Sequence, residues 1–389
     1  MGLLLIWITI NWLIPLKDSL NDKRLVNRGC TYAIALSLIL IQVRTIVENL
    51  DENGITQFLL IASGVATTIS LNRNRAKCLL QWLSFTTVLG SIVVLMPLLT
   101  HYEFTELGIE TLNQEVFKEG FGDLNQLRIV FAFFTITSIA TARISRSSAA
   151  KLIAATAACL GYIVIFATES RMSQIAIPLG AFGGWLFSHW SVIRASKRRT
   201  AKLLLATLAI SLASFVWKIA VGQDLSNGMM SDRGRLALIQ CWGTSILSGS
   251  NRFLMGFGHD KAPIRKLCTD YNIGYFDGND TISSSGHAHN TLINIFAHYG
   301  ILGMIAVGIL CILIGRAITI NSRQDRSQLQ NKSLLSTSWT ECTTSIIISI
   351  SICAFSNTIY IYNHAIQILL GLLIALPFCE DKPNSRIIT

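Results

Sequence analysis

The sequence has few charged residues. Asp, Glu, Lys and Arg make up only 14% of its 389 residues, whereas 51% are hydrophobic and the mean hydropathy is +0.50. Soluble domains carry about 25% charged residues, so this chain cannot cover a globular surface with charge. The scarcity excludes an ordinary soluble protein and indicates that lipid surrounds most of the chain.

The chain also lacks the cysteine spacings that mark metal sites. Its nine cysteines lie mostly within apolar runs, and none forms a Cys-x-x-Cys or Cys/His motif typical of zinc. Only Cys241 and Cys268 share a long polar segment, where a disulfide would require an extracytoplasmic location. A basic, cleavable leader is absent too, so residues 1–16 are expected to form a spanning helix rather than a signal peptide.

Long apolar runs, in contrast, are plentiful. A spanning helix needs about 20 apolar residues, and hydropathy predicts about eleven such helices. They span residues 1–16, 29–43, 55–71, 78–100, 128–142, 152–168, 175–189, 203–220, 290–315, 343–360 and 363–379. Strand edges and loops cannot face lipid, because their backbone groups would stay unpaired. The predicted fold is therefore an all-α polytopic membrane protein with one large extracytoplasmic loop, residues 221–288, between the eighth and ninth helices.

The basic residues that give the chain its net charge of +10 are distributed along it in a way that indicates a membrane topology. Basic residues gather in every second predicted loop, including the loop that follows residue 71 and the one that follows residue 315. The positive-inside rule makes these loops cytoplasmic and places the acidic loops and residues 221–288 outside. The charge therefore does not favour nucleic-acid binding. The same parity leaves the N-terminus outside, so that either the first run is re-entrant or a helix is missing before it.

Two arginines stand at predicted outer helix ends. Arg171 closes a short turn between the sixth and seventh helices, where it either reaches the interface, pairs with Glu169 or binds an anion. Arg235 lies on the same stripe as Trp242 and Ile246 of a short amphipathic helix predicted over residues 236–247. An arginine that points inward there needs an anionic partner, which is either a carboxylate such as Asp232 or a phosphate.

A polar segment begins the ninth predicted helix. Residues 286–290 read Gly-His-Ala-His-Asn, and Asn290, Asn294 and His298 recur at a spacing of four on an otherwise apolar helix. Such a stripe either marks a functional site or hydrogen-bonds neighbouring helices. A histidine at the membrane boundary suits a general base, since its ordinary pKa lies near 6.5. Zinc bound by His287 and His289 with a nearby side chain is a further alternative.

These features, in this order, resemble the O-antigen ligase and O-antigen polymerase superfamily. The resemblance rests on the Thr-Glu-Ser-Arg turn at residues 168–171, on Arg235 followed by the Gly-Phe-Gly turn at 256–258, and on the His-Asn pair at 289–290 before the Gly-Ile-Leu-Gly at 300–303. The position of the large loop, three helices before the C-terminus, also fits. The resemblance covers residues 152–389, the predicted O-antigen ligase-like core, and leaves residues 1–151 as N-terminal transmembrane helices.

The resemblance implies a glycosyltransferase of the bacterial cytoplasmic membrane whose active site faces the periplasm or exterior. It would move a glycan from undecaprenyl diphosphate to a hydroxyl of an acceptor sugar, on lipid A core or on a lipid-linked repeat, without metal or other cofactor. Arg171 and Arg235 are expected to bind the diphosphate, and His289 to act as the base. The other residues expected to contact substrate are Arg233, Arg252, His287, Asn290, Asn294 and His298.

A polysaccharide or lipid transporter, or flippase, is the alternative function. Polar residues within a membrane suit transport as well, and transporters often show inverted repeats and helices broken by glycine or proline near the midplane. This chain has only six prolines and no evident internal repeat, and its polar residues lie at the outer rim. These observations favour the transferase.

Overall fold

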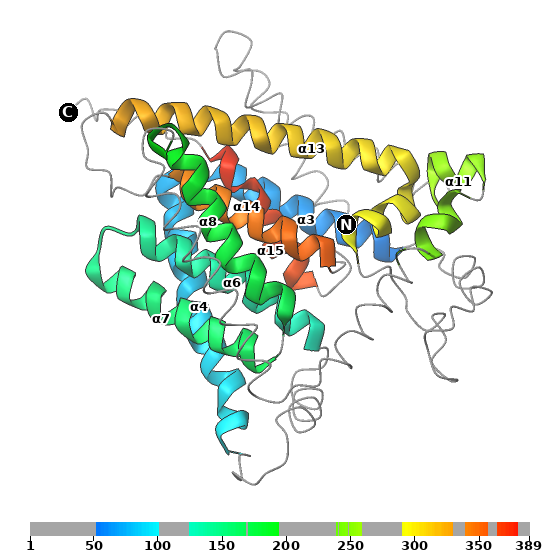
Figure 1. Ribbon diagram of the computed structural model, residues 1–389. Coiled ribbons are helices and arrows are strands. Elements are labelled where there is room, and N and C mark those ends of the chain that lie inside the picture. The colour runs from blue at the N-terminus through cyan, green and yellow to red at the C-terminus, as the bar shows by residue number, and fades with distance from the viewer. Residues whose placement is uncertain are drawn as a thin grey trace. The chain divides into compact units, whose positions relative to one another are not determined.

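The computed structural model describes residues 52–100, 124–168, 170–193, 239, 241–247, 249–258, 290–329, 339–356 and 364–379. Its elements are α3 (Glu52–Ser70), α4 (Arg73–Thr100), α6 (Leu124–Ile144), α7 (Ser148–Ala167), α8 (Arg171–Ile193), α11 (Ser250–Met255), α13 (Thr291–Leu329), α14 (Trp339–Ser356), α15 (His364–Ala375) and the 3-10 turn η2 (Leu376–Phe378) (Figure 1). The described residues hold no strand, which confirms the all-helical class. The predicted helices at 1–16, 29–43 and 203–220 and most of the loop at 221–288 lie outside them, so the number of eleven stays a prediction.

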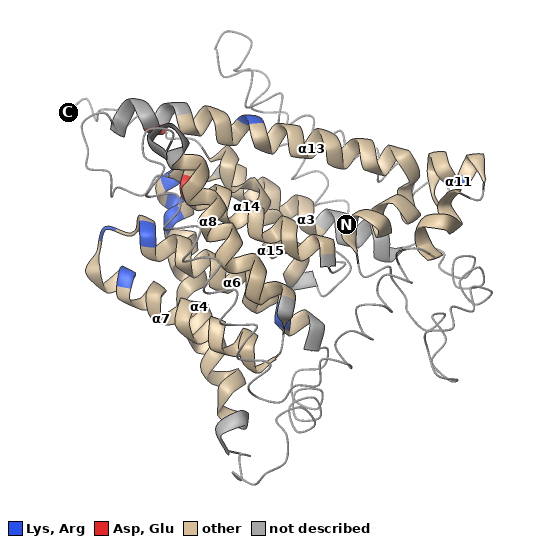
Figure 2. Cartoon of the chain, viewed as in Figure 1, with Lys and Arg blue, Asp and Glu red and all other residues tan. Residues whose placement is uncertain are grey.

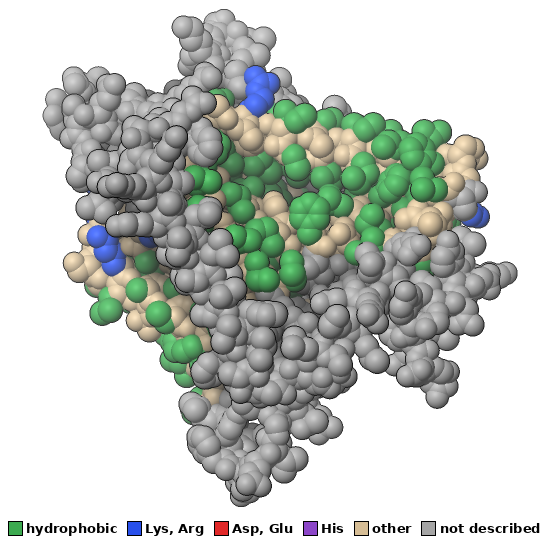
Figure 3. Space-filling model, viewed as in Figure 1, with side chains coloured by type: hydrophobic (Ala, Val, Ile, Leu, Met, Phe, Trp, Pro, Cys, Tyr) green, Lys and Arg blue, Asp and Glu red, His purple; other side chains and the backbone are tan. Residues whose placement is uncertain are grey.

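The described helices are those of a membrane protein. Four segments are long and apolar enough to cross a bilayer, namely Arg73–Met96, Gln126–Ile144, Ser148–Ala167 and Thr291–Ser322, and three shorter apolar helical segments accompany them. Large apolar side chains are exposed along these helices, as for Trp82 on α4 and Leu152 on α7. Figure 3 shows hydrophobic side chains along the visible face of α13. Such surfaces are stable in lipid and costly in water.

Two basic stretches that were predicted to be loops are helical. Arg73, expected in a basic loop, begins α4, and α13 continues through Arg316 to Leu329 instead of ending near residue 315. A helix satisfies its own backbone hydrogen bonds and so need not end where the hydrocarbon ends, whereas hydropathy reports only the part within lipid. Basic side chains gather near the first turns of α4 and α7 (Figure 2).

The chain forms two compact units, which are described separately. Unit 1 comprises Met1–Leu71, Asp232–Thr319 and Gln367–Glu380, and unit 2 comprises Asn72–Ser231, Ile320–Ile366 and Asp381–Thr389. The predicted domain boundary after residue 151 was set by where the family resemblance begins, not by compactness. This boundary stays a prediction.

Small residues let the helices of unit 2 approach closely. α14 packs most extensively on α8, while α6 packs on both α4 and α7. A Cβ added to Gly180 would lie 2.7 Å from the Ser345 carbonyl oxygen, and one added to Gly184 would lie 2.6 Å from the Glu341 carbonyl oxygen. Glycines four residues apart on α8 thus bring its backbone against α14, which is a common way for helices to associate in lipid. Unit 1 uses the same device where Gly64 of α3 meets Gly371 of α15.

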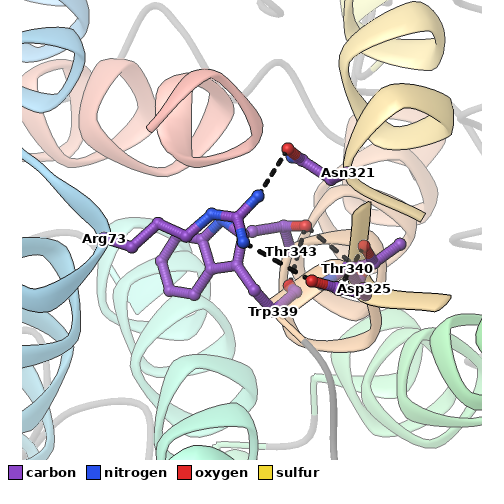
Figure 4. A network of polar contacts seen from close by, with 6 residues as sticks. All are labelled: Arg73, Asn321, Asp325, Trp339, Thr340 and Thr343. Carbon is purple, nitrogen blue, oxygen red and sulfur yellow. Dashed lines mark hydrogen bonds and ion pairs between the residues drawn. The ribbon is translucent and has the colours of Figure 1, made fainter. Parts of the chain in front are cut away.

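A buried polar network joins α4, α13 and α14 within unit 2 (Figure 4). The guanidinium of Arg73, which is 4% exposed, donates to Asn321 Oδ1 at 2.8 Å and pairs with Asp325 Oδ1 at 3.4 Å. The other carboxylate oxygen of Asp325 accepts from the backbone N–H of Thr340 at 3.0 Å and from its hydroxyl at 2.7 Å. Asp325 therefore caps the first turn of α14, where a helix leaves its N–H groups unpaired. Because its members bond one another, the network fastens helices together.

Candidate functional site

The turn at residues 168–171 lies between two antiparallel helices. α7 ends at Ala167, Thr168 is its C-cap, and α8 begins at Arg171. The Ser170 hydroxyl is buried and donates to Ser173 Oγ at 2.6 Å. This arrangement confirms the predicted turn, and it places Arg171 at the N-terminus of α8, with its side chain outside the described atoms.

A second arginine that the sequence reading did not single out lies at this junction. Arg128, in the first turns of α6, donates from Nε to the Thr168 carbonyl oxygen at 2.5 Å. It satisfies a carbonyl that the end of α7 leaves unpaired, and it adds a positive charge to the end of unit 2 where Arg171 stands. The predicted topology could have indicated Arg128, because α6 is predicted to start on the same side of the membrane as α8.

The first turns of α8 are fixed to α7 by a hydrogen bond to a carbonyl oxygen that a proline leaves free. Pro178 has no N–H, so the Gln174 carbonyl oxygen one turn earlier lacks its helical donor. The Tyr162 hydroxyl of α7 donates to that oxygen at 3.0 Å. Gln174 itself is buried. The helix end that carries Arg171 is thereby held in one position relative to α7.

The polar stripe predicted at the start of the ninth helix has two roles in the structure. Asn290 precedes α13 and caps it, because its Oδ1 accepts from the Ile293 N–H at 3.0 Å. Asn294 and His298 are buried on the helix behind the cap. His287 and His289 come just before the cap and lie outside the described residues, so the choice of His289 as the base stays a prediction.

The helix that carries this stripe is broken at Gly300, which corrects the prediction of a continuous helix over residues 290–315. Gly300 has φ 61° and ψ −156°, a conformation available in practice only to glycine. The predicted tight turn at residues 256–258 is confirmed, and it fills the break. The Phe257 N–H donates to the Ala297 carbonyl at 2.7 Å, and the Gly258 N–H donates to the His298 carbonyl at 3.0 Å. The turn therefore supplies the C-terminal cap of the segment at 291–299.

The His298 ring is held by the same turn. Its Nδ1 bonds the Gly258 carbonyl oxygen, and because a carbonyl only accepts, Nδ1 carries a proton. The ring meets Trp242 edge to face, with centroids 6.1 Å apart. Trp242 and Ile246 are fully buried in a cluster with Ala297, which confirms the apolar stripe of the predicted amphipathic helix. Arg233 and Arg235, at its start, lie outside the described residues.

Arg252 is exposed and is associated with the turn rather than with the buried stripe. Its guanidinium carbon lies 5.0 Å from the centroid of the Phe257 ring, and its carbonyl oxygen accepts from the Gly256 N–H at 2.7 Å. The expected contact of Arg252 with substrate stays a prediction.

Cys241, a member of this buried cluster, is disulfide-bonded. The predicted partner, Cys268, lies outside the described residues. The pairing with Cys268 stays a prediction.

The structure thus gathers part of the predicted site around one helix break. Asn290 caps the start of the segment that ends at the break, Asn294 and His298 are buried on that segment, and Arg252 contacts the turn that caps its end. All four belong to unit 1, whereas Arg171 belongs to unit 2. Residues 154–308 match the family model described as O-antigen ligase. This segment of the chain is O-antigen ligase-like. The match confirms the resemblance stated from the motifs, and the family is of the glycosyltransferase type. No curated protein matches the chain.

The O-antigen ligase-like segment begins in α7 and ends in α13 beyond Gly300. It therefore contains both the junction at Arg171 and the helix break capped by the Gly-Phe-Gly turn. Spanning helices together with the match to this family suggest a bacterial inner-membrane protein, and the family is one that implies lipid-linked glycans and sugars as substrates.

Proposed function

We propose that this protein moves a glycan from undecaprenyl diphosphate to the hydroxyl of an acceptor sugar, as an O-antigen ligase or a repeat-unit polymerase. The observation that carries the proposal is the extent of the O-antigen ligase-like segment. Residues 154–308 include all of the candidate site residues chosen from the sequence, from Arg171 to His298.

The donor diphosphate is a strongly anionic leaving group at the membrane surface. Guanidinium groups hold phosphate oxygens through two parallel N–H bonds, and they offset the charge that develops as the glycosidic bond breaks. Arg171 and Arg235 take this role in the proposal. The location of Arg171 at the end of α8, where Arg128 supplies a neighbouring positive charge, supports it.

The acceptor hydroxyl must lose a proton as it attacks the anomeric carbon. In the proposal His289 accepts that proton, a new glycosidic bond forms, the bond to the donor phosphate breaks, and undecaprenyl diphosphate leaves. His289 directly precedes the Asn290 cap of a short helical segment whose other end is capped by the Gly-Phe-Gly turn. A base next in sequence to a capped helical segment suits catalysis, which benefits from a rigid scaffold. The proposal uses no metal.

The active site is proposed to face the periplasm or exterior. The charge pattern of the loops supports this side. The disulfide bond of Cys241 supports it as well, because disulfides persist outside the reducing cytoplasm.

The break in α13 is the observation that favours a transporter. Transporters bind substrates where helices are interrupted within the membrane. Here, however, the backbone of Leu254 and Met255 packs against Gly300, and the Gly-Phe-Gly turn pairs the carbonyls that the break exposes. A filled break serves a fixed scaffold better than a substrate path, which favours the transferase.

Deletion of the gene in its host, followed by electrophoresis of surface glycans and lipid-linked glycans, tests the proposal. Full-length polymer stranded on the carrier indicates a ligase, whereas single repeats without a ladder indicate a polymerase. Unchanged glycans, in a host without a second copy of the gene, contradict both and favour the transporter.

A further inference from the structure

The polar and apolar residues of the short helix α11 lie at its two ends rather than on two opposite faces. Its first turn is polar, with Ser250, Asn251 and Arg252, and its second turn is apolar, with Phe253, Leu254 and Met255. The second turn is not buried, since Leu254 is 50% exposed. Three consecutive large apolar side chains on a loop helix are unfavourable in water, so the sequence of α11 requires a different surrounding for each of its ends.

The apolar end of α11 lies beside the break in α13 (Figure 1). A Cβ added to Gly300 would lie 2.5 Å from the carbonyl carbon of Leu254 and 2.6 Å from the amide nitrogen of Met255. The backbones of the two elements are therefore in direct contact, and the depth of Gly300 in the membrane sets the depth of the second turn of α11.

The length of α13 fixes that depth. The apolar segment Thr291–Ser322 has 32 residues, and at about 1.5 Å per residue it is far longer than the hydrocarbon core of about 30 Å. The part from Gly300 to Arg316 extends about 24 Å, and the long side chain of Arg316, which is exposed, reaches further toward the head groups, so this part nearly spans the core. The part before Gly300 carries the polar Asn294 and His298. The boundary of the hydrocarbon therefore falls close to Gly300.

We propose that the second turn of α11 is inserted into the bilayer at the leaflet where α13 enters, and that its first turn lies among the lipid head groups. The partner of this surface is membrane lipid. Leu302 and Ile305 of α13, just past Gly300, are more than half exposed, so the apolar end of α11 adjoins a helix that already faces lipid. Arg252 at the polar end suits the phosphate level, since basic side chains accompany apolar ones in helices that lie in the interface.

Photocrosslinking in intact membranes tests this inference. p-Benzoylphenylalanine is placed at Leu254 in one variant, at Asn251 in a matched variant of the same helix, and at Ile309 of α13 as a lipid-facing reference. After irradiation the protein is purified, and phospholipid adducts are measured by mass spectrometry. We expect the adduct yield at Leu254 to approach that at Ile309 and to exceed that at Asn251 several-fold.

Adducts at Ile309 without adducts at Leu254, or crosslinks from Leu254 to another protein, would overturn the inference. Equal lipid yields at Leu254 and Asn251 would overturn the division of α11 into an inserted and a surface turn. The three positions are exposed in the structure, so the replacements are compatible with folding. The measurement does not depend on glycosyl transfer, and its result is independent of the proposed function.

Discussion

Arg73 shows how this protein keeps an arginine inside a helical bundle. Its guanidinium bonds Asn321 and Asp325, and Asp325 also caps α14. Arg73→Ala leaves a buried carboxylate without its cation, which costs about 3–5 kcal/mol. Arg75, two residues later, is exposed, and Arg75→Ala is expected to change stability by less than about 0.5 kcal/mol. Thermal unfolding of the purified variants in detergent compares the two. Equal midpoints for both would contradict the structural role of the network.

Gly256 and Gly258 offer a second matched pair. Both have positive φ, 73° and 70°, so an alanine at either position is strained by about 1–2 kcal/mol. A Cβ on Gly256 would also lie 2.5 Å from the His298 carbonyl carbon, whereas one on Gly258 would have no neighbour within 4 Å. We expect Gly256→Ala to lower the unfolding midpoint much more than Gly258→Ala. Similar decreases would show that the turn does not pack against the break.

Arg171 and Arg235 test the diphosphate contact. Lysine keeps the charge but not the planar pair of donors, so Arg171→Lys and Arg235→Lys are each expected to lose about 10- to 100-fold in transfer rate, the equivalent of one charged hydrogen bond. Arg75→Lys is the control. Near-normal rates in both site variants, measured on lipid-linked donor, would remove the two arginines from the mechanism.

At the scale of elements, the contact between α8 and α14 is the most extensive in unit 2 and depends on close backbone approach. Gly184→Leu would place a side chain against the Ser345 N–H and the Glu341 carbonyl oxygen, at 2.7 and 2.6 Å from its Cβ. Overpacking of this kind costs about 1–3 kcal/mol or more. Gly308→Leu, at a position of α13 with no neighbour within 4 Å, is expected to be tolerated. A chromatographic monodispersity assay with thermal unfolding compares them, and equal behaviour would contradict the packing.

The helices themselves could be predicted from hydropathy, but their limits and interruptions could not. Apolar runs report what lies in lipid, and each predicted run within the described residues has a helix. Arg73 was misplaced because its partners, Asn321 and Asp325, are about 250 residues away in the chain. The break at Gly300 depends in the same way on the turn at residues 256–258. Hydropathy and local spacing contain no information about such distant contacts.

The candidate site could be predicted in part. Asn290 and the glycines of the turn could be recognised from local sequence. In the structure Asn290 caps a helix and the two glycines adopt positive φ, so both have a structural role. Arg128 was missed because its bond to the Thr168 carbonyl follows from helix packing, not from a motif. The family match supports the choice of segment, while the roles of Arg171, Arg235 and His289 rest on the resemblance and on chemistry.

At the scale of the whole molecule, the proposed activity first requires that the large loop lie outside the cytoplasm. Alkaline phosphatase is active only outside the cytoplasm, and green fluorescent protein fluoresces only inside. A phosphatase fusion after residue 225 and a fluorescent fusion after residue 332 are therefore both expected to be active, since loop charge places the first site outside and the second inside. Fluorescence from a fusion after residue 225 would place the large loop in the cytoplasm and remove the proposed active site from its lipid-linked donor.

Glycosyl transfer by the purified protein in lipid nanodiscs tests the proposed activity directly. Labelled glycan on undecaprenyl diphosphate, extracted from the deletion strain, is supplied with lipid A core in one reaction and with further lipid-linked repeats in another. We expect the label to move to one of these acceptors without added metal, and we expect His289→Ala to abolish transfer while Arg75→Ala does not. A folded wild-type protein that releases no undecaprenyl diphosphate with either acceptor, or a His289→Ala variant as active as wild type, would contradict the proposal.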